Sequence, residues 1–162
     1  MTISVGDHLP EATLLQMGPD GAEAVSVLAR TAGRKVVIFG LPGAFTGTCS
    51  TAHVPSFMRT KGAFDAKGVD EIICVSVNDP FVMSAWGEAT GAVTAGLTFL
   101  ADAESAFTSA LGLAYDYPPD GFVKRSRRYA LYAVDGVVTV LNLEPDHGMC
   151  AISEGEQLLA AI

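Results

Sequence analysis

The residue best placed to do chemistry is Cys49, in the stretch "LPGAFTGTCS" at residues 41–50. This stretch follows the apolar run "KVVIFG" and surrounds the thiol with glycine, threonine and serine. As a thiolate, cysteine is a strong nucleophile. Free cysteines are often simply buried. Small polar residues, however, fill a hydrophobic core poorly and are well suited to the edge of an exposed site. We therefore expect a reactive, reachable sulfur at position 49.

Two further cysteines could take part in thiol chemistry. Cys74 lies in the apolar run "EIICVSV", which is typical of a buried strand, and Cys150 lies in the turn-rich segment "PDHGMC". Three cysteines are an odd number and make a poor disulfide scaffold, so the chain fits a reducing compartment.

The elements around Cys49 predict how the thiol is positioned. The run 35–41 is short, continuous and apolar, as in a strand covered on both faces, and the stretch 50–68 predicts a helix that stops at Gly68. Cys49 then lies in the first turn of a helix, just past the carboxyl end of a strand. Unpaired amide N–H groups and the positive end of the helix dipole favour an anion there. Pro55 lies beyond the first turn and predicts a kink.

The rest of the chain alternates strands and helices. We predict strands at 69–79 and 96–102, helices at 80–90, 103–113 and 153–162, and a β-hairpin at 127–145. The hairpin turns at Asp135-Gly136, and Ser153 with Glu156 forms a capping box for the last helix. Parallel strands with crossover helices, followed by a hairpin, predict an α/β thioredoxin-like fold with a central mixed sheet flanked by helices. At 162 residues, we expect a single domain, 1–162.

Composition excludes several classes of partner. The net charge of −8 argues against nucleic acid, whose binding depends on basic patches. No apolar stretch reaches the roughly 18 residues that a membrane helix needs. The start "MTISVGDHLPEATL" has the features of no secretory signal. We expect a cytoplasmic protein without nucleic-acid or membrane partners.

Pro42, Thr46 and Cys49 form the pattern P-x-x-x-T-x-x-C, which resembles the active-site signature of peroxiredoxins. The strings "PGAFTGTCSTAHVPSF", "SVNDPFVMSAW", "RSRRYALYAVDGVV" and "LNLEP" are similar to the type II, or peroxiredoxin-5-like, subfamily and follow in the same order. The resemblance runs from "VGDHLP" to the last helix. It implies a thioredoxin-like fold and no cofactor or metal.

The resemblance also implies a thiol-dependent peroxidase that reduces hydrogen peroxide and alkyl hydroperoxides. Cys49 would be the peroxidatic nucleophile and pass through a sulfenic acid. Thr46 would hold the peroxide, Arg128 would stabilise the developing negative charge, and Pro42 would shield the thiolate from water. Arg128 is selected because it directly precedes the aromatic residue that opens "YALYAV"; Arg127 would point to the opposite face of that strand.

How the sulfenic acid is resolved stays open. Cys150 and Cys74 are both candidates, with a slight preference for Cys150 because a loop is easier to expose. Alternatively, thioredoxin or glutathione with glutaredoxin reduces the sulfenic acid directly. The family usually carries proline between the threonine and the cysteine, where this chain has Gly47-Thr48. We expect a more mobile first turn as a result.

The resemblance further implies a homodimer, for which Phe45, Phe81 and Trp86 are candidate contacts, although core packing explains each equally well. Two alternatives remain. Metal could bind Cys49 with His53, or Cys150 with His147, although a structural role suits both histidines better. The chain could instead be a non-catalytic thioredoxin-like redox-sensing or interaction module, which would consume no hydroperoxide.

Overall fold

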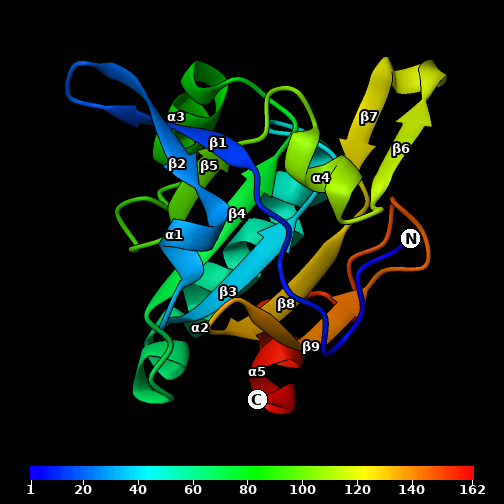
Figure 1. The fold of residues 1–162 in the computed structure, drawn as a ribbon. Coiled ribbons are helices and arrows are strands. Elements are labelled where there is room, and N and C mark those ends of the chain that lie inside the picture. The colour runs from blue at the N-terminus through cyan, green and yellow to red at the C-terminus, as the bar shows by residue number, and fades with distance from the viewer.

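A seven-stranded mixed sheet forms the centre of the computed structural model, which describes residues 1–162 (Figure 1). Its strand order is β2-β1-β5-β4-β3-β8-β9. The strands are β1 (Thr13–Gly18), β2 (Gly21–Ser26), β3 (Lys35–Gly40), β4 (Glu71–Ser76), β5 (Thr98–Ala101), β8 (Tyr129–Val134) and β9 (Val137–Leu143). A separate two-stranded sheet pairs β6 (Ala114–Tyr117) with β7 (Phe122–Ser126).

The three predicted crossover strands lie side by side, because β4 pairs in parallel with β3 and with β5. The predicted hairpin follows as β8 and β9, which are antiparallel and add to the β3 edge. Its turn residues Asp135 and Gly136 both have positive φ, 49° and 75°, as the tight hairpin turn requires. The expected thioredoxin-like fold, a mixed sheet flanked by helices, is confirmed.

Helices cover both faces of the sheet (Figure 1). Alternation along β3 sends Val37 and Phe39 to one face and Val36 and Ile38 to the other. The first face carries α2 (Val54–Ala66), α3 (Pro80–Ala89) and α5 (Gly155–Ala161). The second carries α1 (Val27–Thr31) and α4 (Ala106–Ala110), together with the N-terminal segment. Cys49 belongs to the first apolar cluster, between the sheet and α2.

The predicted kink at Pro55 takes the form of a π-helical turn, Cys49–His53, directly before α2. Proline has no N–H to donate to the preceding turn. The extra residue of the π turn absorbs this irregularity: Val54 N–H donates to Cys49 O, five residues back. Such turns often occur at functional sites. The helix ends at Ala66, and Gly68, the predicted stop, follows two residues later with a φ of +83°.

Four features differ from the sequence prediction. The hairpin β1–β2, the hairpin β6–β7 and the short helix α1 were not anticipated. The predicted capping box of α5 is wrong, because Ser153 donates its hydroxyl to Glu144 while Glu156 pairs with Arg59. The buried carboxylate of Glu144 requires hydrogen-bond donors. In a capping box the Ser153 hydroxyl would bond within the helix and would not be available to Glu144.

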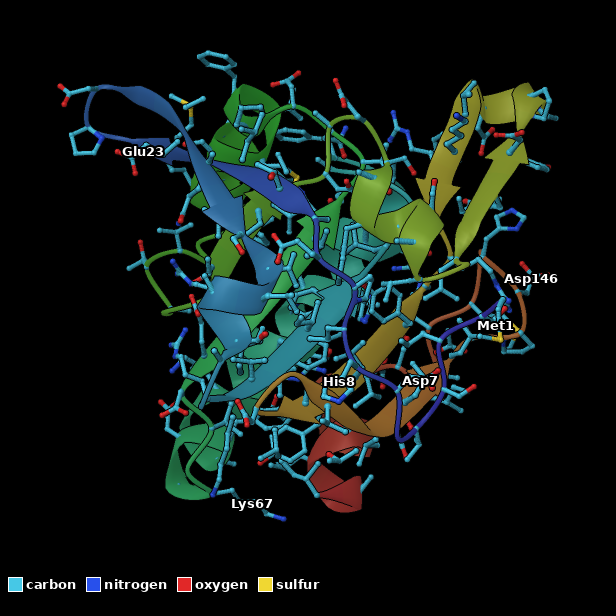
Figure 2. All side chains as sticks on the ribbon, in the orientation of Figure 1. Met1, Asp7, His8, Glu23, Lys67 and Asp146 are labelled. Atoms are coloured by element: carbon cyan, nitrogen blue, oxygen red, sulfur yellow. The ribbon has the colours of Figure 1, made fainter.

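The surface carries most of the charged side chains. Glu23 of β2, Lys67 directly after α2 and Asp146 in the segment after β9 extend into solvent (Figure 2). Within the described residues, no helix has the length and apolar character needed to span a bilayer.

Candidate active site

Cys49 and Arg128 meet at the carboxyl end of β3. Nη2 of Arg128 donates to Sγ of Cys49 at 3.3 Å. Arg128 directly precedes β8, the strand beside β3, so sheet pairing brings two residues that are far apart in sequence into contact. The neighbouring Arg127 turns away and donates to Glu144 O at 3.0 Å. The structure thus places Arg128, and not Arg127, at the thiol.

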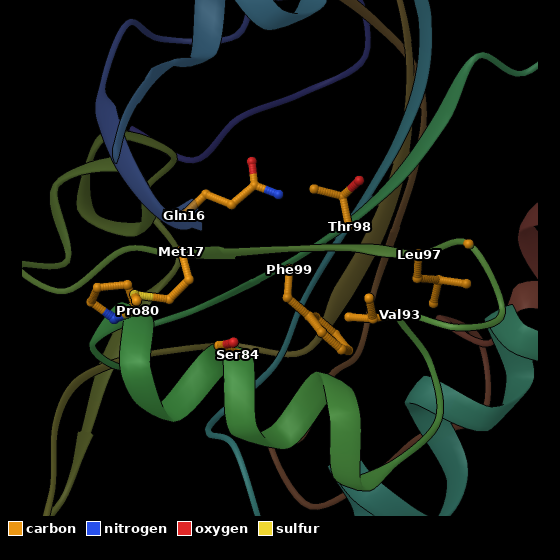
Figure 3. Close-up of a pocket in the computed structure, with 9 residues that line it drawn as sticks. Gln16, Met17, Pro80, Ser84, Val93, Leu97, Thr98 and Phe99 are labelled. Carbon is orange, nitrogen blue, oxygen red and sulfur yellow. The ribbon is translucent and has the colours of Figure 1, made fainter. Parts of the chain in front are cut away.

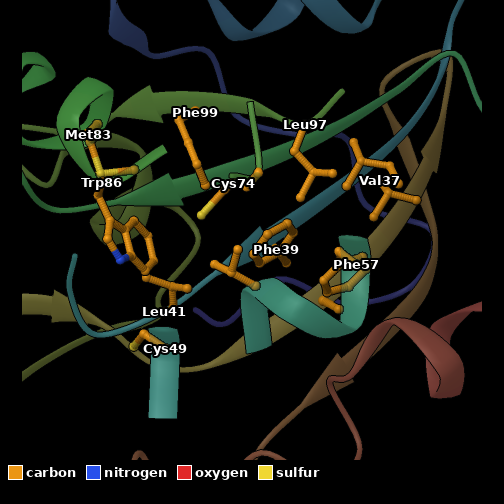
Figure 4. Close-up of a cluster of buried hydrophobic side chains, with 14 of the residues drawn as sticks. Val37, Phe39, Leu41, Cys49, Phe57, Cys74, Met83, Trp86, Leu97 and Phe99 are labelled. Carbon is orange, nitrogen blue, oxygen red and sulfur yellow. The ribbon is translucent and has the colours of Figure 1, made fainter. Parts of the chain in front are cut away.

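The expectation that Cys49 lies on an exposed rim is wrong: the residue is only 1% exposed. Its turn packs onto the apolar cluster that contains Leu41 and Trp86 (Figure 4). The small residues of the turn allow this close packing, while exposed Gly47 and half-buried Thr46 form the outer edge of the site. A purely structural cysteine would not need a buried arginine donating to its sulfur, so burial here accompanies a polar site.

His53 completes a row of three side chains. Its Nδ1 lies 3.2 Å from Nη1 of Arg128, and its Nε2 lies 3.0 Å from the carbonyl oxygen of Ser153. The ring is fully buried and packs against Phe39 and Phe57. Burial, with the charge of Arg128 beside it, lowers the pKa of His53 to about 3. The imidazole is therefore neutral at physiological pH.

The loop before Cys49 is held by two hydrogen bonds from other parts of the chain and by one within the loop. Asn78 Oδ1 accepts from Ala44 N at 3.0 Å, and Arg125 Nη1 donates to Pro42 O at 3.1 Å. Thr46 Oγ1 donates to Gly43 O at 2.7 Å. Sequence analysis missed Asn78 and Arg125. Asn78 precedes the predicted helix 80–90 and Arg125 lies among the basic residues before Arg128, and neither position carries a local sequence signal for contact with this loop.

Gly43 is required by this anchoring. A Cβ on it would lie 2.5 Å from Nη1 of Arg125, so the guanidinium can reach Pro42 only because the glycine has no side chain. The following turn is further constrained by Phe45, whose φ is 60°, a left-handed conformation that bulky residues rarely adopt.

Trp86 supports the site from α3. Its Nε1 donates to Ser50 Oγ at 3.0 Å, next in sequence to Cys49. Trp86 is 1% exposed, whereas Phe45 and Phe81 are 59% and 66% exposed. Trp86 is therefore a core residue and cannot serve as the surface contact that was considered for it.

All three cysteines are free thiols in this structure. Cys74 is fully buried in β4, within the same apolar cluster as Cys49; Leu41 and Trp86 lie between the two in Figure 4. Burial, with the charge of Cys49 as a smaller cause, raises the pKa of Cys74 well above its usual range. Cys150 is half-buried, and burial raises its pKa to about 11. Its Sγ lies 3.9 Å from Ser153 Oγ.

A buried carboxylate, that of Glu144, holds the segment 144–153, which carries Cys150, in place by hydrogen bonds. Glu144 Oε1 accepts from the backbone N–H groups of Ala151, Ile152 and Ser153 and from Ser153 Oγ, at 2.7–2.8 Å. Although burial opposes ionisation, these donors lower the pKa of Glu144. In the same segment, the His147 ring lies against Tyr115 and Tyr117 of β6. No sequence signal marked Glu144.

The structure places no further metal ligands beside either pair considered from the sequence, Cys49 with His53 or Cys150 with His147. Both ring nitrogens of His53 are engaged by Arg128 and Ser153, and no three His, Cys, Asp or Glu side chains converge as a metal ion would require. A cavity of about 340 Å³ lies elsewhere, between α3 and strands β1 and β5 (Figure 3). It includes no residue of the loop and turn 41–53.

Comparison with known proteins agrees with this geometry. Residues 4–159 match the family model described as Redoxin. The chain is 51% identical to Peroxiredoxin-2E-2, chloroplastic, of Oryza sativa subsp. japonica, over 99% of this chain and 73% of that protein. It is 46% identical to Peroxiredoxin-2E, chloroplastic, of Arabidopsis thaliana, over 99% and 70% of the two chains.

The chain belongs to the peroxiredoxins. Among solved structures, reduced Prx3 of Vibrio vulnificus in complex with H2O2 superposes with a TM-score of 0.93 at 47% identity, covering 99% of each chain. The chain is accordingly an enzyme with thiol-dependent peroxidase activity, and a non-catalytic module is no longer needed to account for it. The resemblance found in P-x-x-x-T-x-x-C is confirmed.

The expectation of a cytoplasmic protein must be corrected. Both plant relatives above, at 51% and 46% identity, are chloroplastic. An odd number of cysteines is compatible with any reducing compartment, of which the cytosol is only one.

Proposed function

We propose that this peroxiredoxin reduces hydrogen peroxide and alkyl hydroperoxides at Cys49, within residues 1–162 acting as one domain. The observation that carries the proposal is the contact of Cys49 Sγ with Arg128, a buried cation whose guanidinium donates to the sulfur at 3.3 Å. A positive charge at this distance attracts the negative charge of the sulfur as it reacts. It also favours the negative charge that develops when a peroxide bond breaks.

In the reaction, the thiolate of Cys49 attacks one peroxide oxygen in line with the O–O bond. A sulfur–oxygen bond forms, the O–O bond breaks, and its electron pair leaves on the second oxygen. That oxygen takes a proton and departs as water or an alcohol. The sulfur has been oxidised by two electrons to a sulfenic acid, and the peroxide has been reduced by two.

Thr46 and Pro42 would orient and protect the reactants. The Thr46 hydroxyl donates a hydrogen bond to Gly43 O. The lone pairs of the hydroxyl oxygen then remain free to accept a hydrogen bond from the peroxide O–H. Pro42 is buried and has no N–H of its own, so it presents an apolar ring while Arg125 fixes its carbonyl. Arg128 Nη2, already at the sulfur, would donate to the departing oxygen.

For resolution we favour Cys150 over Cys74. Cys74 lies in the middle of a fully buried strand, whereas Cys150 is half-buried in a segment outside regular structure. The π turn at Cys49 and the segment 144–153 would both have to open before a disulfide could form. Burial raises the pKa of both thiols, so either would have to become exposed before it could react as a thiolate. The oxidised enzyme would then be recycled by thioredoxin, or by glutathione with glutaredoxin.

We further propose a homodimer formed through the face near the active site. Phe45 on the loop before Cys49 and Phe81 at the start of α3 are large exposed apolar side chains, and burying them against a second copy would be favourable. Equilibrium sedimentation of the native chain and of Phe81→Asp tests this. A monomer in both samples would contradict the dimer.

The test of the reaction is a peroxidase assay with thioredoxin and glutaredoxin systems in parallel, on the native chain and on three single Cys→Ser variants. Cys49→Ser should abolish turnover and Cys74→Ser should retain it. Cys150→Ser should keep one stoichiometric turnover but lose turnover with thioredoxin. Mass spectrometry of the unreduced, peroxide-treated protein should show a Cys49–Cys150 link. Turnover that survives Cys49→Ser would refute the proposed function.

A further inference from the structure

Arg128 is an unusual buried cation because no carboxylate accompanies it. The side chain is 2% exposed, yet none of the ion pairs in the structure includes it. Its Nε has no partner at all. Only Nη1 and Nη2 are engaged, by His53 and Cys49. Burying an uncompensated charge is costly, so this arrangement suits a site in which a negative charge forms beside the guanidinium.

The hydrogen bonds of His53 define its tautomer. Ser153 O can only accept, so Nε2 of His53 carries the proton and donates to it at 3.0 Å. Nδ1 therefore has a free lone pair, which accepts from Nη1 of Arg128 at 3.2 Å. Phe39 and Phe57 pack on the ring, with centroid distances of 5.0 and 5.7 Å, and limit its rotation.

We propose that His53 is a positioning residue that aims Arg128 at Cys49 without neutralising it. The proposal rests on the proposed function at Cys49. A carboxylate in the place of His53 would also accept from Nη1, but its negative charge would cancel much of the field of the guanidinium at the sulfur. A neutral imidazole supplies the acceptor alone, so the full positive charge remains available to the thiolate and to the departing oxygen.

The support of His53 extends to the segment that carries Cys150. Ser153, whose carbonyl fixes the ring, is itself held by Glu144 Oε1 through its N–H and its hydroxyl, both at 2.8 Å. Opening of the segment 144–153 would withdraw this carbonyl from His53. A chain of hydrogen bonds thus couples the position of the segment 144–153 to the orientation of the guanidinium toward Cys49. It runs through Glu144, Ser153, His53 and Arg128.

Three substitutions of His53 separate its effect on the orientation of Arg128 from the effect of a charge at this position. His53→Asn places a neutral acceptor where Nδ1 lies, His53→Asp has the same shape with a negative charge, and His53→Leu offers no acceptor. Each loses the bond to Ser153, so His53→Asn is the matched control for the other two. The readout is the second-order rate constant for a single turnover with hydrogen peroxide, from pH 5 to pH 9, on variants whose folding is verified by circular dichroism.

At pH 7 we expect His53→Asn to react within about fivefold of the native chain. Relative to His53→Asn, the Asp and Leu variants should each be slower by at least about tenfold, the scale of losing one oriented donor or its charge. The Asp variant should also shift its pH–rate profile to higher pH. Equal rates for Asp and Asn at all pH values, or for Leu and Asn, would overturn the proposal.

A measurement on the native chain guards against variants that fail to fold. ¹⁵N NMR of the imidazole should show a neutral His53 with the proton on Nε2 throughout pH 5–8. A proton on Nδ1, or a charged ring at pH 7, would also overturn the proposal. A native chain that consumes no peroxide would instead contradict the proposed function itself, and the NMR result would still report on the positioning role.

Discussion

The burial of His53 makes the stability of the fold depend on pH between about 3 and 6.5. The pKa of His53 falls from its ordinary 6.5 to about 3 in the folded chain. Between those values the unfolded chain binds a proton at this ring that the folded chain does not. Stability therefore decreases as pH falls below 6.5, by about 1.4 kcal/mol per pH unit. From pH 7 to pH 5 the expected loss is about 2 kcal/mol.

Urea unfolding at pH 7, 6 and 5 measures this loss directly, with the fluorescence of Trp86, the single tryptophan, as the signal. The control is His53→Asn, which keeps an acceptor for Arg128 but cannot titrate. His8, His147 and the carboxylates are present in both proteins, so their contributions cancel in the difference. The native chain should lose about 2 kcal/mol more than the variant between pH 7 and pH 5. Parallel pH dependences in the two proteins would refute the assignment of a buried, neutral His53.

Three substitutions and one control test the packing around the site by urea unfolding, followed by circular dichroism because one variant lacks Trp86. Gly155→Ala should lower the free energy of unfolding by about 1–3 kcal/mol, because the new Cβ would lie 2.4 Å from Thr60 Oγ1. The control is Gly62→Ala in α2, which has open space around it and should raise the free energy of unfolding by about 0.5–1 kcal/mol. Gly47→Ala, also with open space, should stabilise the first turn by about 0.4–1 kcal/mol without lowering peroxide turnover; a lower stability would contradict this. Trp86→Phe removes the bond to Ser50 Oγ and should cost about 1–2 kcal/mol with faster amide exchange in residues 49–53; unchanged exchange would contradict that role.

The parts of the fold that were predicted from sequence have strong local signals. The run "KVVIFG" is continuously apolar because β3 is covered on both faces, and Asp135-Gly136 predicts a tight turn because both residues tolerate positive φ. The start of α3 was equally clear, since Asp79 caps it by accepting from Val82 N. By contrast, β2 is largely exposed and packs little apolar surface, so its sequence "GAEAVS" has no strong periodicity.

The candidate site was predicted only in part, for a related reason. Cys49, Thr46 and Pro42 lie on one continuous loop, so a motif can reveal them. Arg128 could be selected only through the family resemblance, and His53 and Arg125 became visible only once the sheet brought their partners together. Glu144 lies in the string "LNLEP", which predicts the end of a strand and resembles the family but does not indicate a buried carboxylate. Contacts between residues some 75 positions apart, such as His53 and Arg128, leave no local pattern in a single sequence.

The burial of Cys49 was missed because composition was taken as a guide to exposure. Small polar residues can line an exposed rim, but they also allow a turn to approach the sheet closely. Here the π turn brings Cys49 onto the apolar cluster while Arg128 supplies the polar contact.

The most direct test of the account is a stopped-flow reaction of the fully reduced chain with one equivalent of hydrogen peroxide. Trp86 reports on the turn through its bond to Ser50, and mass spectrometry locates the added oxygen. We expect a rapid fluorescence change with stoichiometric peroxide loss and oxidation of Cys49, which mass spectrometry shows as one added oxygen atom in Cys150→Ser and as the Cys49–Cys150 disulfide in the native chain. The change and the peroxide loss should be absent in Cys49→Ser and slowed at least about a hundredfold in Arg128→Met. Peroxide that survives contact with the native chain, or that Arg128→Met consumes at the native rate, would contradict the claim that a thiolate beside this buried guanidinium performs the reaction.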